Sequence, residues 1–236
     1  MSVKSVRGAA NWLDVVGVAA LLPSADLVLP SLWEAITGTR EVTWGMEGPD
    51  GKLTFTPEMD RCWQWKDELP AKGHALVGKH LGRWAALVAP RLICEVWTVA
   101  AERRESLTEL QLEIVDAVRE NGACTVPQLR ALVPGAEKKH VDQLQRALVL
   151  TNSHLVEQSQ GWPAIAVDLV DELWDLHEVP DAEAELALAV LESSGELSAA
   201  DLGGALGWRV KRSREVLDAL DLRVRVEADV RLYSSV

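Results

Sequence analysis

The chain has 236 residues, of which 48% are hydrophobic and 25% are charged, so it can bury real cores and shows no sign of global disorder. Its formal net charge of −12 repels polyanions at long range, which argues against non-specific nucleic-acid binding and restricts any DNA contact to a local basic patch. The three cysteines are widely spaced and none has a partner at zinc-ligand spacing, so we expect neither a disulfide framework nor a metal site.

Targeting signals are weak throughout the sequence. No apolar run reaches the roughly 18–20 residues needed to cross a bilayer, so no membrane contact is expected. A secretory signal is equally unexpected, because the apolar run 15–22 is short and two polar residues, Asn11 and Asp14, interrupt the approach to it. Together with the unpaired cysteines, this predicts a cytoplasmic protein.

Residues 1–108 stand apart as a Trp-rich N-terminal α+β domain, because seven of the ten tryptophans lie there. Residues 11–22 read as a buried helix, and residues 32–37 as a short helix capped by Ser31. Residues 45–57 are rich in glycine and proline, which predicts a turn-rich loop.

The rest of this first domain is harder to assign. Residues 63–65 alternate Trp-Gln-Trp as a strand does, and residues 66–70 break out of that alternation. Residues 87–99 are apolar with one proline, and both a buried strand and a buried helix remain open. The tryptophans are spread singly, which favours core positions, although exposed ones could stack on bases.

Residues 109–176 predict a first winged-helix module. A helical apolar stripe begins at Leu110 and ends at Asn121-Gly122, and Thr125 caps the next helix. A Pro-Gly turn separates that helix from a third. The first helix should therefore end at residue 121, and the second and third should cover 127–132 and 137–150. The two strands of the ribbon are expected at 155–158 and 163–169, with Gln160-Gly161 at their tip.

Residues 177–236 repeat this order and predict a second winged-helix module. A first helix covers 184–191, and a short helix over 198–206 ends at Gly207-Trp208. The second helix of the motif covers 209–220, and two alternating runs, 222–226 and 230–233, form the wing. The fold class is therefore mainly α with an α+β character: tandem winged helices behind the Trp-rich domain.

The second module carries the better nucleic-acid site. Residues 209–214 hold four basic side chains and no acid, and they open the helix that enters the major groove in helix-turn-helix proteins. Val210, Leu217 and Leu220 should face the core. The candidate DNA-contacting residues are Arg209, Lys211, Arg212, Arg214, Arg223, Arg225 and Arg231.

A structural interpretation of the same arginines stays open. They could pair with neighbouring acids instead of phosphates, because residues 177–236 hold twelve acidic and seven basic side chains. The acidic candidates are Glu215, Asp218, Asp221, Glu227 and Asp229.

Catalytic chemistry has little support. Asp67 and Glu68 lie beside tryptophans, which could raise a carboxyl pKa for acid–base work, but a solvated turn or a structural ion pair with Lys66 explains them better. No Walker loop, GxGxxG or GxSxG motif is present, so we expect no cofactor, and the sequence leans away from an enzyme.

Three strings carry a resemblance to a known family: Leu29-Pro-Ser-Leu-Trp-Glu-Ala-Ile36, Trp63-Gln-Trp-Lys-Asp-Glu-Leu-Pro70 and Gly78-Lys-His-Leu81. Followed by winged-helix patterns, they resemble bacterial AlkZ-related proteins, distant relatives of the AlkZ/YcaQ-type DNA glycosylases, over about residues 10–220. The resemblance implies tandem winged helices and a role linked to DNA repair.

Those glycosylases use a Gln-x-Gln or Gln-x-Asp motif in their N-terminal half. Here Gln143-Leu-Gln145 and Gln158-Ser-Gln160 have that spelling but lie in the first winged helix, so no catalytic residue is carried over.

The leading hypothesis is a winged-helix protein that binds duplex DNA through its C-terminal module. Two alternatives remain: an acidic winged-helix scaffold for a protein partner or a second copy, and a divergent glycosylase that uses Asp67 or Glu68.

Overall fold

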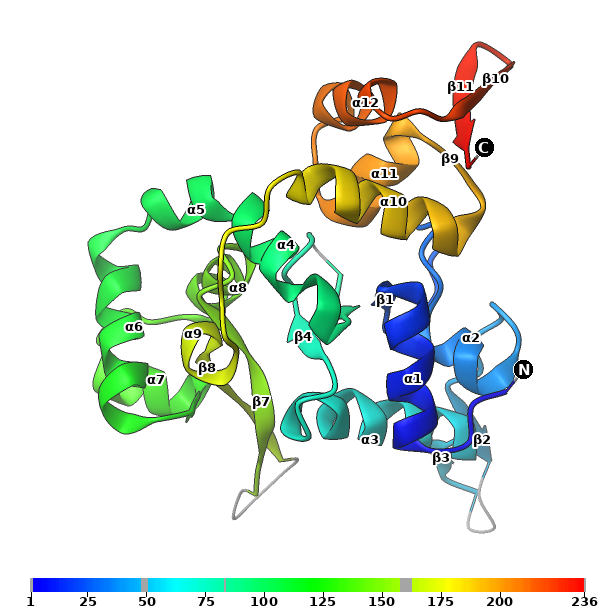
Figure 1. Ribbon diagram of the computed structural model, residues 1–236. Helices are drawn as coiled ribbons and strands as arrows, with labels where there is room; N and C mark the ends of the chain where they lie inside the picture. Colours follow the sequence, from blue (N-terminus) through cyan, green and yellow to red (C-terminus); the bar gives the residue numbers. More distant parts are fainter. Residues whose placement is uncertain (1, 48–50, 83, 158–162, 236) are drawn as a thin grey trace.

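The computed structural model describes residues 2–47, 51–82, 84–157 and 163–235. The fold is α+β: helices alternate with small antiparallel sheets, and two winged-helix-like units follow a mixed N-terminal region (Figure 1). The predicted fold class is therefore confirmed. Among the described residues, no helix is both long enough and apolar enough to span a membrane.

The first helix, α1 (Val6–Val16), is shorter than predicted. Ser5 caps it by accepting a hydrogen bond from the Gly8 N–H at 3.1 Å, and Gly17 ends it with φ of 76°. The prediction of a helix running to residue 22 is wrong because this glycine turns the chain into strand β1 (Val18–Ala20). Strand β1 pairs antiparallel with β5 (Ala86–Val88), which pairs with β4 (Leu76–Gly78).

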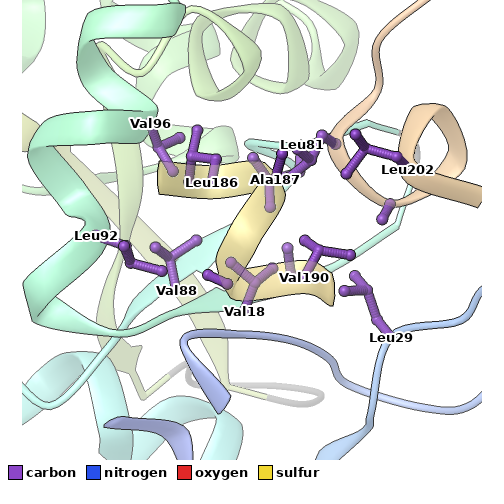
Figure 2. Packing of buried hydrophobic residues seen from close by; sticks show 14 of the residues in the cluster. Val18, Leu29, Leu81, Val88, Leu92, Val96, Leu186, Ala187, Val190 and Leu202 are labelled. Carbon is purple, nitrogen blue, oxygen red and sulfur yellow. The ribbon is translucent and has the colours of Figure 1, made fainter. Parts of the chain in front are cut away.

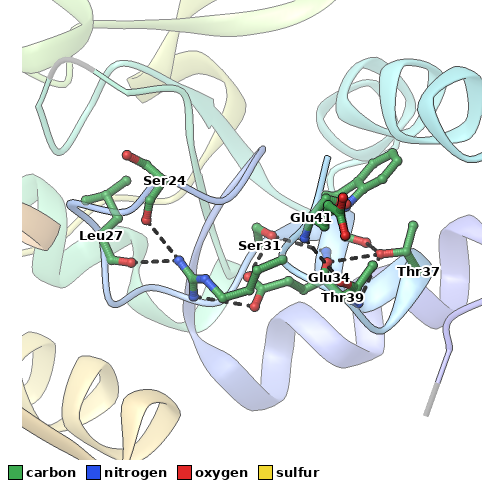
Figure 3. A network of polar contacts seen from close by, with 9 residues as sticks. Ser24, Leu27, Ser31, Glu34, Thr37, Thr39 and Glu41 are labelled. Carbon is green, nitrogen blue, oxygen red and sulfur yellow. Dashed lines mark hydrogen bonds and ion pairs between the residues drawn. The ribbon is translucent and has the colours of Figure 1, made fainter. Parts of the chain in front are cut away.

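Helix α2 (Leu32–Thr37) confirms the capped short helix, because the Ser31 hydroxyl accepts from the Glu34 N–H at 3.1 Å. Around it, the Arg40 guanidinium donates to the carbonyls of Ser24 and Leu27, both at 2.9 Å, and so ties the preceding loop to this helix (Figure 3). The region predicted as a loop contains a short hairpin of β2 (Gly45–Glu47) and β3 (Leu53–Phe55).

The tryptophan pair at 63 and 65 lies on a helix, α3 (Pro57–Ala71), so the strand-like interpretation of this stretch is wrong. The Thr56 hydroxyl caps the helix and a proline fills its first turn. Met59, Cys62 and Leu69, spaced three and seven residues apart, are fully buried on one face. This helical spacing outweighs the short alternation of the two tryptophans.

The undecided stretch 87–99 contains both kinds of structure. Strand β5 is followed by a short 3₁₀ helix, η1 (Pro90–Leu92), and then by α4 (Ile93–Val99). A further short helix, α5 (Ala101–Glu105), leads into the first winged-helix unit.

The first winged-helix unit has the predicted order of elements. Thr108 and Thr125 each form a reciprocal capping box with the glutamine three residues later, which fixes the starts of two helices. The predicted tip at 160–161 lies outside the described residues. The elements of this first unit are α6 (Glu109–Asn121), β6 (Cys124–Thr125), α7 (Val126–Leu132), α8 (Lys138–Arg146), β7 (Leu150–Val156) and β8 (Ala164–Leu169), followed by α9 (Val170–Leu173).

The second unit has the same strand arrangement. In the first unit the last strand lies between the other two, in the order β6-β8-β7, and in the second the order is β9-β11-β10. The two units therefore share one architecture. The second comprises α10 (Ala182–Ser194), β9 (Glu196–Ser198), α11 (Ala199–Leu206), α12 (Val210–Ala219), β10 (Arg223–Glu227) and β11 (Val230–Ser234).

The largest core joins the start of the chain to its end. Figure 2 shows Val18 and Val88 of the first sheet packed near Leu186 and Val190 of α10, and the same cluster reaches Leu202 of α11. Two further clusters fill the rest of the N-terminal region and the first winged-helix unit. The domain boundaries after residues 108 and 176 stay a prediction.

Candidate nucleic-acid interface

The turn between α11 and α12 is tight, and its glycine, Gly207, lies directly against Leu81 and Gly82 of the N-terminal region. Ser198 and Asp201 form a capping box at the start of α11, and Gly207 ends it in the left-handed region with φ of 68°. A Cβ atom at position 207 would collide with the carbonyl oxygen of Leu81. Only glycine fits this contact without displacement, so the turn fixes where α12 begins relative to the 81–82 loop.

Helix α12 buries a narrower face than predicted. Ser213 and Leu217 are fully buried, and the Ser213 hydroxyl donates to the Arg209 carbonyl at 3.3 Å. Val210, predicted to face the core, is 46% exposed, and that prediction is wrong because this first residue of α12 lines the open cavity between the helix and β11. Arg209, Lys211 and Arg214 are exposed.

Acidic side chains pair with four of the seven candidate residues. On α12, Arg212 binds Glu183 of α10 and lies over the Trp208 ring with its guanidinium carbon 5.1 Å from the ring centroid. Lys211 lies 3.8 Å from Glu215. These two cations are therefore partly neutralised before any ligand arrives.

The wing shows the same pairing. Arg225 contacts Glu196 of β9 at 2.9 Å and Glu227 at 3.1 Å, and the hydrogen bond to Glu196 raises the pKa of its guanidinium. Arg231 lies 3.4 Å from Asp218, which also accepts the Tyr233 hydroxyl at 2.6 Å. Each wing pair stays solvent-exposed, so it is worth little to stability.

Three candidates differ from the others. Arg209, Arg214 and Arg223 are exposed, and no carboxylate among the described residues forms an ion pair with them. Arg214 and Arg231 also line one cavity of about 400 Å³ between α12 and β11, which brings the helix and the wing to one surface. The free positive charge of the module is thus smaller than its sequence indicates.

Asp67 and Glu68 each form an ion pair with a neighbouring lysine of α3 or its end. Lys66 Nζ lies 2.6 Å from an Asp67 oxygen and 5.0 Å from the Trp63 ring centroid, and Glu68 pairs with Lys72 at 2.6 Å. Burial raises the pKa of the Asp67 carboxyl, and the hydrogen bond from Lys66 opposes that effect. Both carboxylates are held in ion pairs, and a catalytic role for Asp67 or Glu68 stays a prediction.

The sequence model of the AlkZ-related family matches residues 3–196. The chain belongs to the AlkZ-related family. The match ends at the start of β9, so α12 and the wing lie beyond it. No curated protein and no solved structure matches the chain.

In this AlkZ-related protein, Gln145 has a structural role, because both atoms of its side-chain amide are hydrogen-bonded. It is 5% exposed, accepts from the Lys79 N–H at 2.9 Å and donates to Asn152 at 2.7 Å. The first bond joins α8 to the N-terminal region and the second joins it to β7, so both ends of the amide are used. Gln143 is exposed on α8, and the Gln158–Gln160 spelling lies outside the described residues.

Two further arginines that were not singled out from the sequence lie close to each other, and one of them, Arg103, is also near Arg212 of α12. Arg103 of α5 and Arg146 of α8 are far apart in the chain, yet both are close enough to Arg212 or to each other to lower the pKa of Arg103 by repulsion, after a larger effect of burial. Arg103 has only Arg104 as a basic neighbour, between Glu102 and Glu105, and Arg146 has none, so no basic run marks either position.

Proposed function

We propose that this AlkZ-related protein binds duplex DNA through its C-terminal winged helix, in DNA repair or the response to DNA damage. The observation that carries the proposal is the exposure of three arginines that have no acidic partner among the described residues, Arg209 and Arg214 at α12 and Arg223 on the wing. In winged helices these two elements meet the groove and the adjacent backbone. Membership of the AlkZ-related family, together with the resemblance of such proteins to the AlkZ/YcaQ-type DNA glycosylases, supports a DNA ligand.

The paired arginines limit how strongly DNA can be held. Each phosphate neutralised by a free cation contributes about −0.9 to the slope of log affinity against log salt. Three unpaired arginines therefore predict a slope of about −3, whereas seven would give about −6. The interaction should be weak at physiological salt, because the net charge of −12 opposes it.

Fluorescence anisotropy with a labelled duplex of about 20 base pairs, between 20 and 200 mM salt, tests the proposal. We expect Arg209→Gln, Arg214→Gln and Arg223→Gln combined to abolish detectable binding. The matched control is Lys211→Gln with Arg225→Gln, which removes cations that already have acidic partners and should change affinity much less. The absence of wild-type binding at 20 mM salt, or equal binding by the triple variant, would overturn the proposal.

A second candidate function, docking of a protein partner, is favoured by a groove of about 860 Å³ beside α10 and α12. Its walls include Val99, Leu188 and Leu220, and its rim carries Glu102 and Glu185. Apolar walls with an acidic rim fit a basic amphipathic segment of another protein. A lysine-rich helical peptide should bind, and Leu188→Lys should prevent binding without changing DNA affinity.

A further inference from the structure

A second polar cavity, of about 330 Å³, lies where α5, α6 and α8 meet. Arg103 and Arg146 line it together with hydroxyl and amide side chains, and no carboxylate does. This composition is unusual in a chain with twelve more acidic than basic residues. The polar side chains of the lining are Arg103, Ser106, Thr108, Gln111, Gln143 and Arg146.

The hydrogen bonds fix how the Gln143 amide points. The Thr108 backbone N–H can only donate, and it donates to Gln111 Oε1 at 2.8 Å. The Gln111 amide nitrogen must therefore be the group that donates to Gln143 at 3.0 Å, which makes the Gln143 atom an oxygen. The Gln143 NH₂ group is left as a donor, and nothing in the described part of the chain accepts from it.

Backbone carbonyls, not carboxylates, hold the two arginines. Arg103 Nη1 donates to the Arg146 carbonyl at 3.0 Å, and Arg146 Nε donates to the Gly82 carbonyl at 3.4 Å. These bonds leave both terminal nitrogens of Arg146 without an acceptor among the described residues. The guanidinium groups are therefore positioned without an ion pair among the described residues, and the attraction of Glu102 for Arg103 ranks below the repulsion from Arg212 and Arg146.

The electrostatics of the cavity point the same way. Burial lowers the pKa of the Arg103 guanidinium, and repulsion from Arg212 and then Arg146 lowers it further. Arg212 has its counterion in Glu183, whereas no ion pair is found for Arg103 or Arg146 in the described residues. An anion in the cavity would relieve this repulsion.

We propose that this cavity binds a phosphate group. Two guanidinium groups and one amide offer more donors than the two oxygens of a carboxylate can accept, and a phosphate presents at least three strong acceptor oxygens. The volume also leaves room for the sugar or the water attached to that phosphate. The group can come from a free nucleotide or from a nucleic-acid backbone, and the site does not depend on the contacts of α12.

The test uses the full chain and three probes: inorganic phosphate, a deoxynucleoside 5′-monophosphate and a short duplex. Calorimetry measures affinity for the first two, and anisotropy measures it for the third. Arg146→Gln should weaken binding at least about tenfold, because it removes charge-assisted hydrogen bonds. Gln143→Ala should weaken it about threefold, as expected for one neutral donor. Arg130→Gln, an exposed cation elsewhere in the same unit, is the matched control.

The outcomes separate the sources of the phosphate. A loss confined to phosphate and nucleotide identifies a free nucleotide, and a loss of duplex affinity identifies a backbone phosphate. Either result supports the site, even if the α12 variants show that the C-terminal unit does not bind DNA. The proposal is overturned if Arg146→Gln leaves the affinity for every probe unchanged, or if none of the probes binds. If circular dichroism shows that Arg146→Gln is unfolded, the exposed Gln143→Ala variant decides by the same criterion.

Discussion

His80 provides the sharpest stability prediction, because it is a buried imidazole at a junction between two parts of the fold. It is 1% exposed, its Nδ1 donates to the Gln145 carbonyl at 2.9 Å, and its Nε2 lies 3.3 Å from the Thr151 hydroxyl. Burial lowers its pKa from 6.5 to about 4 in the folded protein, outweighing the backbone hydrogen bonds. The neutral ring is therefore the form that the fold accommodates.

The sign of the effect follows from proton binding. Below pH 6.5 the unfolded chain binds a proton at this position and the folded chain does not, so the free energy of unfolding falls as the pH falls. With these two pKa values, the loss attributable to His80 is about 2 kcal/mol at pH 5 and about 3 kcal/mol at pH 4. It is complete once the pH is below the folded value.

Urea unfolding followed by tryptophan fluorescence measures this loss, since Trp33 and Trp65 are buried at 2% and 5% exposure. His80→Gln removes the titrating group, so its stability should fall less than that of the wild type between pH 7 and pH 4, by about 3 kcal/mol. His154→Gln, at an exposed position, controls for the loss of an imidazole. If the wild type and His80→Gln lose stability in parallel, to within about 1 kcal/mol, the assigned burial effect is wrong.

Two further predictions concern a glycine and the thiols. In urea unfolding, Gly207→Ala should lower the free energy of unfolding by more than the about 1–2 kcal/mol of a left-handed alanine, because the added Cβ also collides with the Leu81 carbonyl. Gly38→Ala is the control: Gly38 has a similar φ and open space around it, so this variant should show only the conformational cost. In native protein at pH 8, a chromogenic disulfide reagent should react first with half-buried Cys94, since burial raises the pKa of the Cys62 thiol to about 12; reaction of Cys62 at the same rate would contradict this.

The sequence revealed local features well, because their causes lie within a few residues. The caps at Ser31 and Thr125 were readable from a hydroxyl residue before an apolar periodic run, and each accepts the expected backbone N–H. The winged-helix order followed from those caps and the glycine stops. Helix α3 was missed because two tryptophans near its middle, Trp63 and Trp65, suggested alternation.

The candidate site was less readable, because its charge balance depends on contacts between distant residues. Glu215, Asp218 and Glu227 were expected as partners from their proximity in the chain. Glu183 and Glu196, each 29 positions from its arginine, were not, because only the packing of α10 and β9 brings them near. The same reason hid the Arg103–Arg146 cavity, whose two arginines are separated by 43 positions.

The shared core described above has a consequence for how this protein can be dissected. Helix α10 buries Leu186 and Val190 against Val18 and Val88, so cutting the chain before residue 177 would expose an apolar face of α10 to solvent. A fragment that holds the last sixty residues alone should therefore aggregate and should not bind a ligand specifically. The C-terminal unit and the N-terminal region therefore form one packed body, and a ligand bound to the C-terminal unit lies at a fixed distance from the N-terminal region.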